Sequence, residues 1–164
     1  MTTNVALVGL ARDLEARAQA RKPVRIGLVG TGEMGTDIVA RVAHMRGVEI
    51  GAISELNPEA ALKAVEIAYG DRERARRAES ASAISAAIEA QKIAITDNAD
   101  SLIENGQIDV VVDATGVPAV GAEIGLKAME GGKHLVMMNV EADVTIGAYL
   151  KSEADRLGVT YSLG

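Results

Sequence analysis

The chain has 164 residues, and 48% of them are hydrophobic, which is enough for one domain with a real core. A formal net charge of −6 argues against nucleic acid or an anionic membrane as the main partner. The absence of cysteine excludes disulfides, thiolate catalysis and cysteine-bound metals. Because no apolar run could span a bilayer and no basic leader opens the chain, we expect a cytoplasmic protein.

The opening segment, as far as Gln19, predicts a helix with Leu7, Leu10 and Leu14 on one face. This helix precedes the first strand of the core. We therefore expect residues 1–22 to be a helical extension used for packing or subunit contact, and residues 23–164 to form the main domain.

Six aliphatic runs predict β-strands, at residues 24–29, 48–54, 92–96, 109–114, 133–138 and 159–163. Helical patterns separate them, and this alternation is typical of an α/β fold with a doubly wound parallel six-stranded sheet. The stretch from Asp71 to Ala90 predicts an additional helix between the second and third strands. We expect the short helix after the third strand to be capped by Asp97 or Asn98, and the last helix by Asp143 or Thr145.

A glycine-rich motif lies where the first strand meets the next helix, and it reads Gly30-Thr31-Gly32-Glu33-Met34-Gly35. In this G-x-G-x-x-G pattern Gly30 permits a tight turn, Gly32 lets a diphosphate approach the backbone, and Gly35 lets the helix pack on the strand. The helix N-terminus then holds the diphosphate. The motif predicts a dinucleotide-binding Rossmann domain over residues 23–164; a structural turn or another nucleotide ligand are the alternatives.

The second strand ends at Ser54 and Glu55, and Glu55 stands 20 positions after Gly35. A carboxylate there can accept hydrogen bonds from the adenosine ribose. It would repel a 2′-phosphate, so it favours NAD over NADP. The arginine-rich run 72–77 could instead bind a 2′-phosphate, but a solvated helix face laced with ion pairs is the preferred interpretation.

Two further strand ends carry candidate cofactor residues, because ligands lie outside the carboxyl ends of such strands. Thr115 and Gly116 follow the fourth strand and could line the nicotinamide side; a plain strand-to-helix turn is the alternative. Asn139 and Glu141 follow the fifth strand and could contact nicotinamide or substrate, with helix capping as the alternative. His134 lies at the opposite end of its strand and is interpreted as structural, and His44 as solvated. No residue cluster has metal-ligand spacing.

Three segments, at residues 25–39, 108–116 and 132–147, carry a resemblance to a known family. They are similar to the amino-terminal part of homoserine-dehydrogenase-like oxidoreductases, a group that includes 1-deoxy-D-xylulose 5-phosphate reductoisomerase-like enzymes. The resemblance implies an NAD(P)-dependent reductase acting on a small carbonyl or sugar-phosphate substrate. It also implies a following catalytic domain and a homodimer.

By position, the resemblance places Gly30, Gly32, Glu33, Met34 and Gly35 at the diphosphate, Thr115 and Gly116 near nicotinamide, and Asn139 and Glu141 at the junction with substrate. It identifies no catalytic residue. Homoserine dehydrogenases commonly have Lys where this chain has Val140, which argues against homoserine as substrate.

Two other classes of function compete with the oxidoreductase hypothesis. One is a stand-alone NAD(H)-binding module that senses redox state. The other is an S-adenosylmethionine methyltransferase, which the third glycine and the following Thr36-Asp37 disfavour. We expect this chain alone to bind a dinucleotide without turnover, since a second domain would have to shape the substrate pocket.

Overall fold

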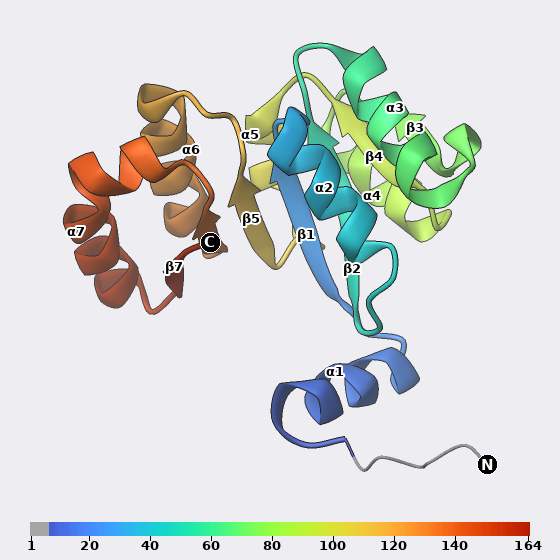
Figure 1. Cartoon of the computed structure of the whole chain (residues 1–164), viewed down its shortest axis with the longest axis horizontal. Helices are drawn as coiled ribbons and strands as arrows, with labels where there is room; N and C mark the ends of the chain where they lie inside the picture. Colours follow the sequence, from blue (N-terminus) through green and yellow to red (C-terminus); the bar gives the residue numbers. More distant parts are fainter. Residues whose placement is uncertain (1–6) are drawn as a thin grey trace.

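The computed structural model describes residues 7–164, which form an α/β domain built on a seven-stranded sheet (Figure 1). Every strand pairing is parallel, and the order is β3-β4-β2-β1-β5-β6-β7. The strands are β1 (Val24–Val29), β2 (Val48–Ser54), β3 (Ala75–Arg77), β4 (Ile93–Thr96), β5 (Val110–Asp113), β6 (His134–Met137) and β7 (Tyr161–Leu163). The helices are α1 (Gly9–Gln19), α2 (Glu33–Val42), α3 (Pro58–Tyr69), α4 (Ala81–Glu89), α5 (Ala99–Ile103), α6 (Pro118–Glu130) and α7 (Val140–Leu157), with a 3₁₀ turn η1 (Arg72–Arg74).

The predicted fold class is confirmed, and the six predicted strands are present as β1, β2, β4, β5, β6 and β7. Numbered among themselves along the chain, these six lie in the order 3-2-1-4-5-6 in the sheet. Strand β3 is the correction, because it adds a seventh strand at the edge of the sheet. Within residues 7–164, each helix is too short or too polar to cross a bilayer.

The predicted helix over Asp71 to Ala90 is wrong in its first half. The Asp71 side chain accepts a hydrogen bond from the N–H of Glu73 and starts the 3₁₀ turn η1. Residues 75–77 then pair with 93–95 of β4 as a short edge strand. The arginines of 72–77 therefore lie on a turn and a sheet edge, where exposed charge discourages pairing with other chains. The helix itself begins after Ser80, whose hydroxyl accepts the N–H of Ala83.

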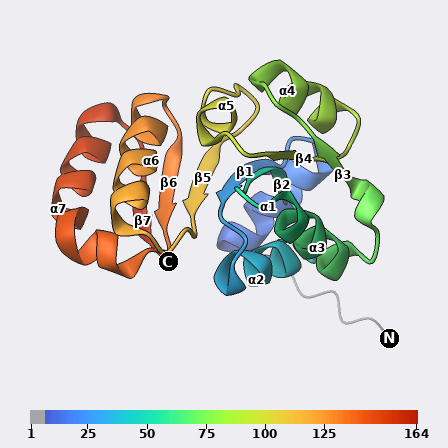
Figure 2. The same ribbon diagram turned by 90° about the horizontal axis from the view of Figure 1, so that it is seen from above.

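Two apolar clusters hold the helices on opposite faces of the sheet. Helices α2 and α3 bury Val39, Val65 and their neighbours against Leu28 and Ile53. Helices α4 to α7 bury a second set on the other face, including Leu135. Viewed from above, α2 and α3 lie on one side of the strands and α4 and α5 on the other (Figure 2). Because the strands are parallel, the connections after β1, β2, β5 and β6 all leave from one common edge of the sheet.

The amino-terminal helix α1 stands beyond the beginning of β1 (Figure 1). It begins at Gly9, so the first leucine of the predicted face, Leu7, precedes it, and residues 1–6 lie outside the described part of the chain. None of its residues is buried, and Leu10 is 73% exposed. An ion pair of 3.0 Å between Glu15 and Arg46 ties the helix to the domain.

Candidate cofactor site

The glycine turn between β1 and α2 has the backbone geometry that its motif requires. Gly30 has φ +92°, and a Cβ placed on it would lie 2.8 Å from the carbonyl oxygen of Ala114. Its N–H donates to the carbonyl of Ser54 at 2.9 Å, which joins the turn to the end of β2. A Cβ on Gly35 would overlap the carbonyl oxygen of Gly30. Close backbone packing therefore requires glycine at positions 30 and 35.

Gly32 is different, because its surroundings are open. It is exposed, has φ −63°, and a Cβ on it would have no atom within 4 Å. It is the N-cap of α2 but provides no side-chain hydrogen bond to the first turn. An uncapped helix N-terminus beside open space can accommodate an anion such as a diphosphate. Glu33 and Met34 are both exposed at the start of this turn.

The Glu55 carboxylate turns back onto the glycine turn. Its Oε2 accepts the N–H of Thr31 at 2.7 Å and the Thr31 hydroxyl at 2.8 Å, and its Oε1 accepts the N–H of Asn57 at 3.0 Å. Burial alone would raise the pKa of Glu55, but these hydrogen bonds outweigh it and lower the pKa below its usual value. Glu55 therefore stays ionised and fixes the turn, and its half-exposed carboxylate retains lone pairs for a further donor.

Sequence analysis missed Lys63 as a candidate cofactor residue. A hollow of about 340 Å³ lies between α2 and α3, lined by Thr31, Gly32 and Glu33 on one side and by Lys63 on the other. The α3 residues that line it are Ala60, Lys63, Ala64 and Ile67. Their i, i+3, i+4, i+7 spacing is one face of a helix, so the helical period could have found them.

The end of β5 lies against the glycine turn. The Cα of Thr115 is 3.1 Å from the position that a Cβ on Gly30 would take. The N–H of Thr115 donates to Asp113 at 3.2 Å, and Gly116 follows with φ +66° and open space around it. The structure therefore brings Thr115 together with Gly30, Thr31, Ser54 and Glu55.

The end of β6 is tied to the end of β5 by buried polar groups. Asn139 is 2% exposed and is the N-cap of α7, accepting the N–H of Ala142 at 3.2 Å. Its Nδ2 and the Oδ2 of Asp113 are both buried without a hydrogen bond, and both border the position that a Cβ on Gly121 would take. Burial raises the pKa of Asp113, and hydrogen bonds from Thr115 oppose that rise. Asn139 thus caps α7 as a buried side chain, whereas Glu141 is exposed on the first turn of that helix.

The predicted caps at the start of α7 were wrong. The Asp143 carboxylate accepts the hydroxyl of Tyr161, and the Thr145 hydroxyl donates to the carbonyl of Glu141 at 2.7 Å. Both side chains therefore lie inside the helix, about one helical turn after its first residue, Val140. Of the two predicted candidates for the cap of α5, Asp97 and Asn98, the structure shows Asn98, and Asn57 caps α3. His134 accepts the N–H of Thr160 at 3.0 Å, in agreement with its structural interpretation.

A parallel doubly wound sheet with this glycine turn is typical of nucleotide-binding Rossmann domains. The family described as the NAD-binding domain of homoserine dehydrogenase matches residues 30–163, and the chain belongs to this family. Homoserine dehydrogenase from Methylobacillus glycogenes is 30% identical over 128 residues, which cover 72% of this chain and 25% of that protein. The chain thus spans about a quarter of that relative.

Solved structures of oxidoreductases share the fold at low identity. The WlbA dehydrogenase from Bordetella pertussis, in complex with NADH and UDP-GlcNAcA, matches with TM-score 0.63 and 22% identity, over 87% of this chain and 37% of that one. Biliverdin reductase from Synechocystis sp. PCC 6803, with biliverdin and NADP⁺, matches with TM-score 0.58 and 22% identity, over 86% and 37%. Family membership makes this chain an NAD(P)-binding domain of an oxidoreductase family.

Proposed function

We propose that this domain holds the diphosphate of NAD(H) on the N-terminus of α2, with Gly32 as the point of closest approach. The observation that carries the proposal is the open, uncapped start of α2 at Gly32. Any side chain at this position would occupy the space that the diphosphate would take. Thr31, Glu33, Met34 and Gly35 complete the diphosphate-binding turn.

The two halves of the dinucleotide would extend from this turn in opposite directions along the sheet edge. The adenosine ribose would lie beside Ser54 and Glu55 at the end of β2. The nicotinamide would lie beside Thr115 and Gly116, next to Glu141 on α7. Asn139 is proposed to act there through the backbone that it caps, because its side chain is buried.

The proposed preference for NAD(H) over NADP(H) rests on Glu55. Its carboxylate is held ionised at the end of β2 by the bonds from Thr31 and Asn57. A 2′-hydroxyl could donate to it, whereas a 2′-phosphate would meet a like charge. Lys63 is the cation best placed to offset that repulsion, because it lines the neighbouring hollow.

We further propose that the whole protein is a reductase or reductoisomerase of the homoserine-dehydrogenase-like type, acting on a small carbonyl or sugar-phosphate substrate. The bound nicotinamide would supply the hydride, and this domain would bind and orient it. Val140 argues against homoserine itself. We propose that a further domain provides the substrate-binding groups. We also propose that residues 1–22, which include α1, form an extension outside the cofactor domain.

Backbone amide NMR shifts on titration with NADH test the proposed placement. The largest shifts should fall on Glu33, Met34 and Gly35, with smaller ones at Thr115 and Gly116. Amides at the opposite edge of the sheet, such as that of Asp109, should stay in place. Shifts centred on that opposite edge would contradict the proposed site.

A further inference from the structure

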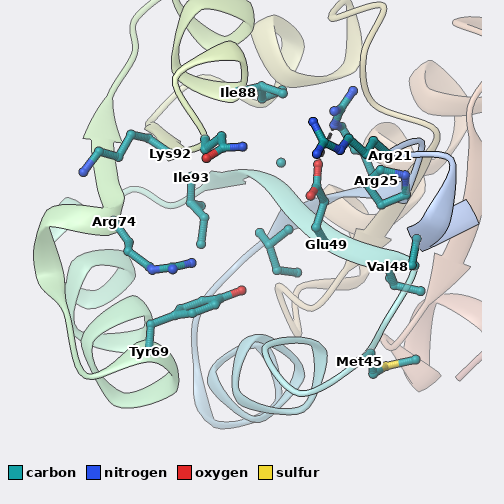
Figure 3. Close-up of a pocket in the computed structure, with 16 residues that line it drawn as sticks. Arg21, Arg25, Met45, Val48, Glu49, Tyr69, Arg74, Ile88, Lys92 and Ile93 are labelled. Carbon is teal, nitrogen blue, oxygen red and sulfur yellow. Dashed lines mark hydrogen bonds and ion pairs between the residues drawn. The ribbon is translucent and has the colours of Figure 1, made fainter. Parts of the chain in front are cut away.

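A second pocket lies at the amino-terminal edge of the sheet, opposite the glycine turn. Its volume is about 560 Å³, within the range of small-molecule sites. It is lined by the starts of β2 and β4, the end of α3, and the segments that follow α1 and α4 (Figure 3). Nothing in the proposed cofactor site uses this pocket.

The pocket is basic although the chain as a whole is acidic. Four cationic side chains line it, namely Arg21, Arg25, Arg74 and Lys92, against a single carboxylate, Glu49. The formal net charge of the chain is −6, so this concentration of positive charge is local. A concave, positively charged surface attracts anions.

Two of these guanidinium groups lack a carboxylate partner. Glu49 is engaged by Arg25, with 2.6 Å between Nε and Oε1. Lys92 donates to the carbonyl of Glu73. Within residues 7–164, Arg21 and Arg74 have no ion pair, and Arg74 instead lies over the ring of Tyr69, 5.1 Å from its centroid. Both guanidinium groups are planar donors suited to a carboxylate or phosphate.

The backbone around the pocket gives independent support. Within residues 7–164, Arg21 (φ +54°) and Gln91 (φ +58°) are the non-glycine residues with positive φ, and both line this pocket. They follow the ends of α1 and α4, where glycine is the usual residue; α3 and α7 end in Gly70 and Gly158. Left-handed backbone is unfavourable for a non-glycine residue, because its Cβ crowds the following carbonyl oxygen. Long polar side chains are therefore kept on the pocket rim at a cost in stability.

We propose that this pocket binds a small dianionic metabolite through phosphate or carboxylate groups. Figure 3 shows Arg74 above Tyr69 on one side of the pocket, and Arg21 and Arg25 near Glu49 on the other. One acidic group lies beside Arg21 and Arg25, and the second lies beside Arg74. The aliphatic side chains of Ile88 and Ile93 line the pocket as well and contact the carbon body of the ligand.

Calorimetric titration of the whole chain tests this site, with NADH present at saturation so that phosphate-bearing probes cannot enter the cofactor site. The probes are glutarate, 3-phosphoglycerate, inorganic phosphate and, as a monoanion, acetate. Glutarate or 3-phosphoglycerate should bind with one-to-one stoichiometry and more tightly than acetate. Binding of both glutarate and 3-phosphoglycerate would mean that the site accepts dianions with either carboxylate or phosphate groups. Binding of 3-phosphoglycerate or phosphate without glutarate would mean that the ligand carries a phosphate group.

Three variants locate the binding. Arg74→Gln and Arg21→Gly should each weaken it by roughly tenfold or more, the loss expected for a charge-assisted hydrogen bond. Arg21→Gly also relieves the positive φ, so its thermal stability should be kept or raised while binding falls. Arg77→Gln on β3, which does not line the pocket, is the matched control and should bind like wild type. Equal binding by all variants, or no dianion binding tighter than acetate, would overturn the proposal.

Discussion

At the scale of single residues, Glu55 has a structural role that does not depend on a cofactor. Its carboxylate accepts both the N–H and the hydroxyl of Thr31 and thereby fixes the glycine turn. The sequence predicted a carboxylate at this strand end but not these bonds, because they depend on how the turn folds back over β2. The residue thus combines a structural contact with its proposed contact to the ribose.

The proposed preference for NAD(H) can be tested with Glu55→Gln, which removes the charge and keeps the shape. Wild type should bind NADH more tightly than NADPH, and the variant should lose roughly tenfold of that preference, as expected for one like-charge contact. Dissociation constants for both cofactors measure it, with Glu59→Gln as the control. Tighter NADPH binding in wild type, unchanged in Glu55→Gln, would show that the carboxylate does not face the ribose and would direct attention to Lys63.

The lowered pKa of Glu55 also predicts a pH dependence of stability. A carboxyl group whose pKa is lower in the folded state contributes stability above its unfolded pKa, and this contribution is lost as the pH falls through the folded pKa. Acidification from about pH 7 to about pH 3 should therefore destabilise wild type more than Glu55→Gln. Urea unfolding at both pH values measures the difference. Parallel losses in the two proteins would mean that the Thr31 and Asn57 bonds do not stabilise the ionised form.

At the scale of elements, six of the seven strands could be predicted because each is a continuous aliphatic run, and most helices because their apolar residues recur at helical spacing. The stretch 71–90 could not, since β3 is three residues long and mostly charged, and only its pairing with β4 makes it a strand. A local pattern of charges at helical spacing therefore gave the wrong element. The start of α7 was misplaced because Asn139, Asp143 and Thr145 are all residue types that cap helices. The structure shows that Asn139 is the cap, since it accepts the N–H of Ala142.

The cap of α7 predicts a specific loss of stability. Asn139→Ala removes the acceptor for the N–H of Ala142 and should cost about 1 kcal/mol. For a domain of this size that lowers the midpoint of thermal unfolding by about 2–4 °C. Thr145→Ala is the control, because its exposed hydroxyl only donates to a carbonyl within the helix and its loss should cost less than about 0.5 kcal/mol. Equal effects of the two substitutions would contradict the assignment of Asn139 as the cap.

At the scale of the whole molecule, the parallel sheet separates two kinds of surface. Its carboxyl edge gathers Gly30, Glu55 and Thr115, and their convergence could be predicted from the sequence because they follow strands whose order is typical of the fold. The basic pocket at the other edge could not be predicted. Its arginines come from separate segments that converge only in three dimensions, and the sequence showed only an acidic chain.

The central claim is that the start of α2 holds the diphosphate of the cofactor, and Gly32→Val tests it most directly. NADH affinity is measured by fluorescence titration of wild type, Gly32→Val and the control Gly106→Val, with thermal unfolding to verify the fold. Both glycines lack a positive φ and have open space around the Cβ position, so both variants should fold. The account predicts that Gly32→Val loses at least roughly tenfold in affinity, because its side chain occupies the diphosphate position, while Gly106→Val binds like wild type. Unchanged NADH affinity in a folded Gly32→Val protein would contradict it.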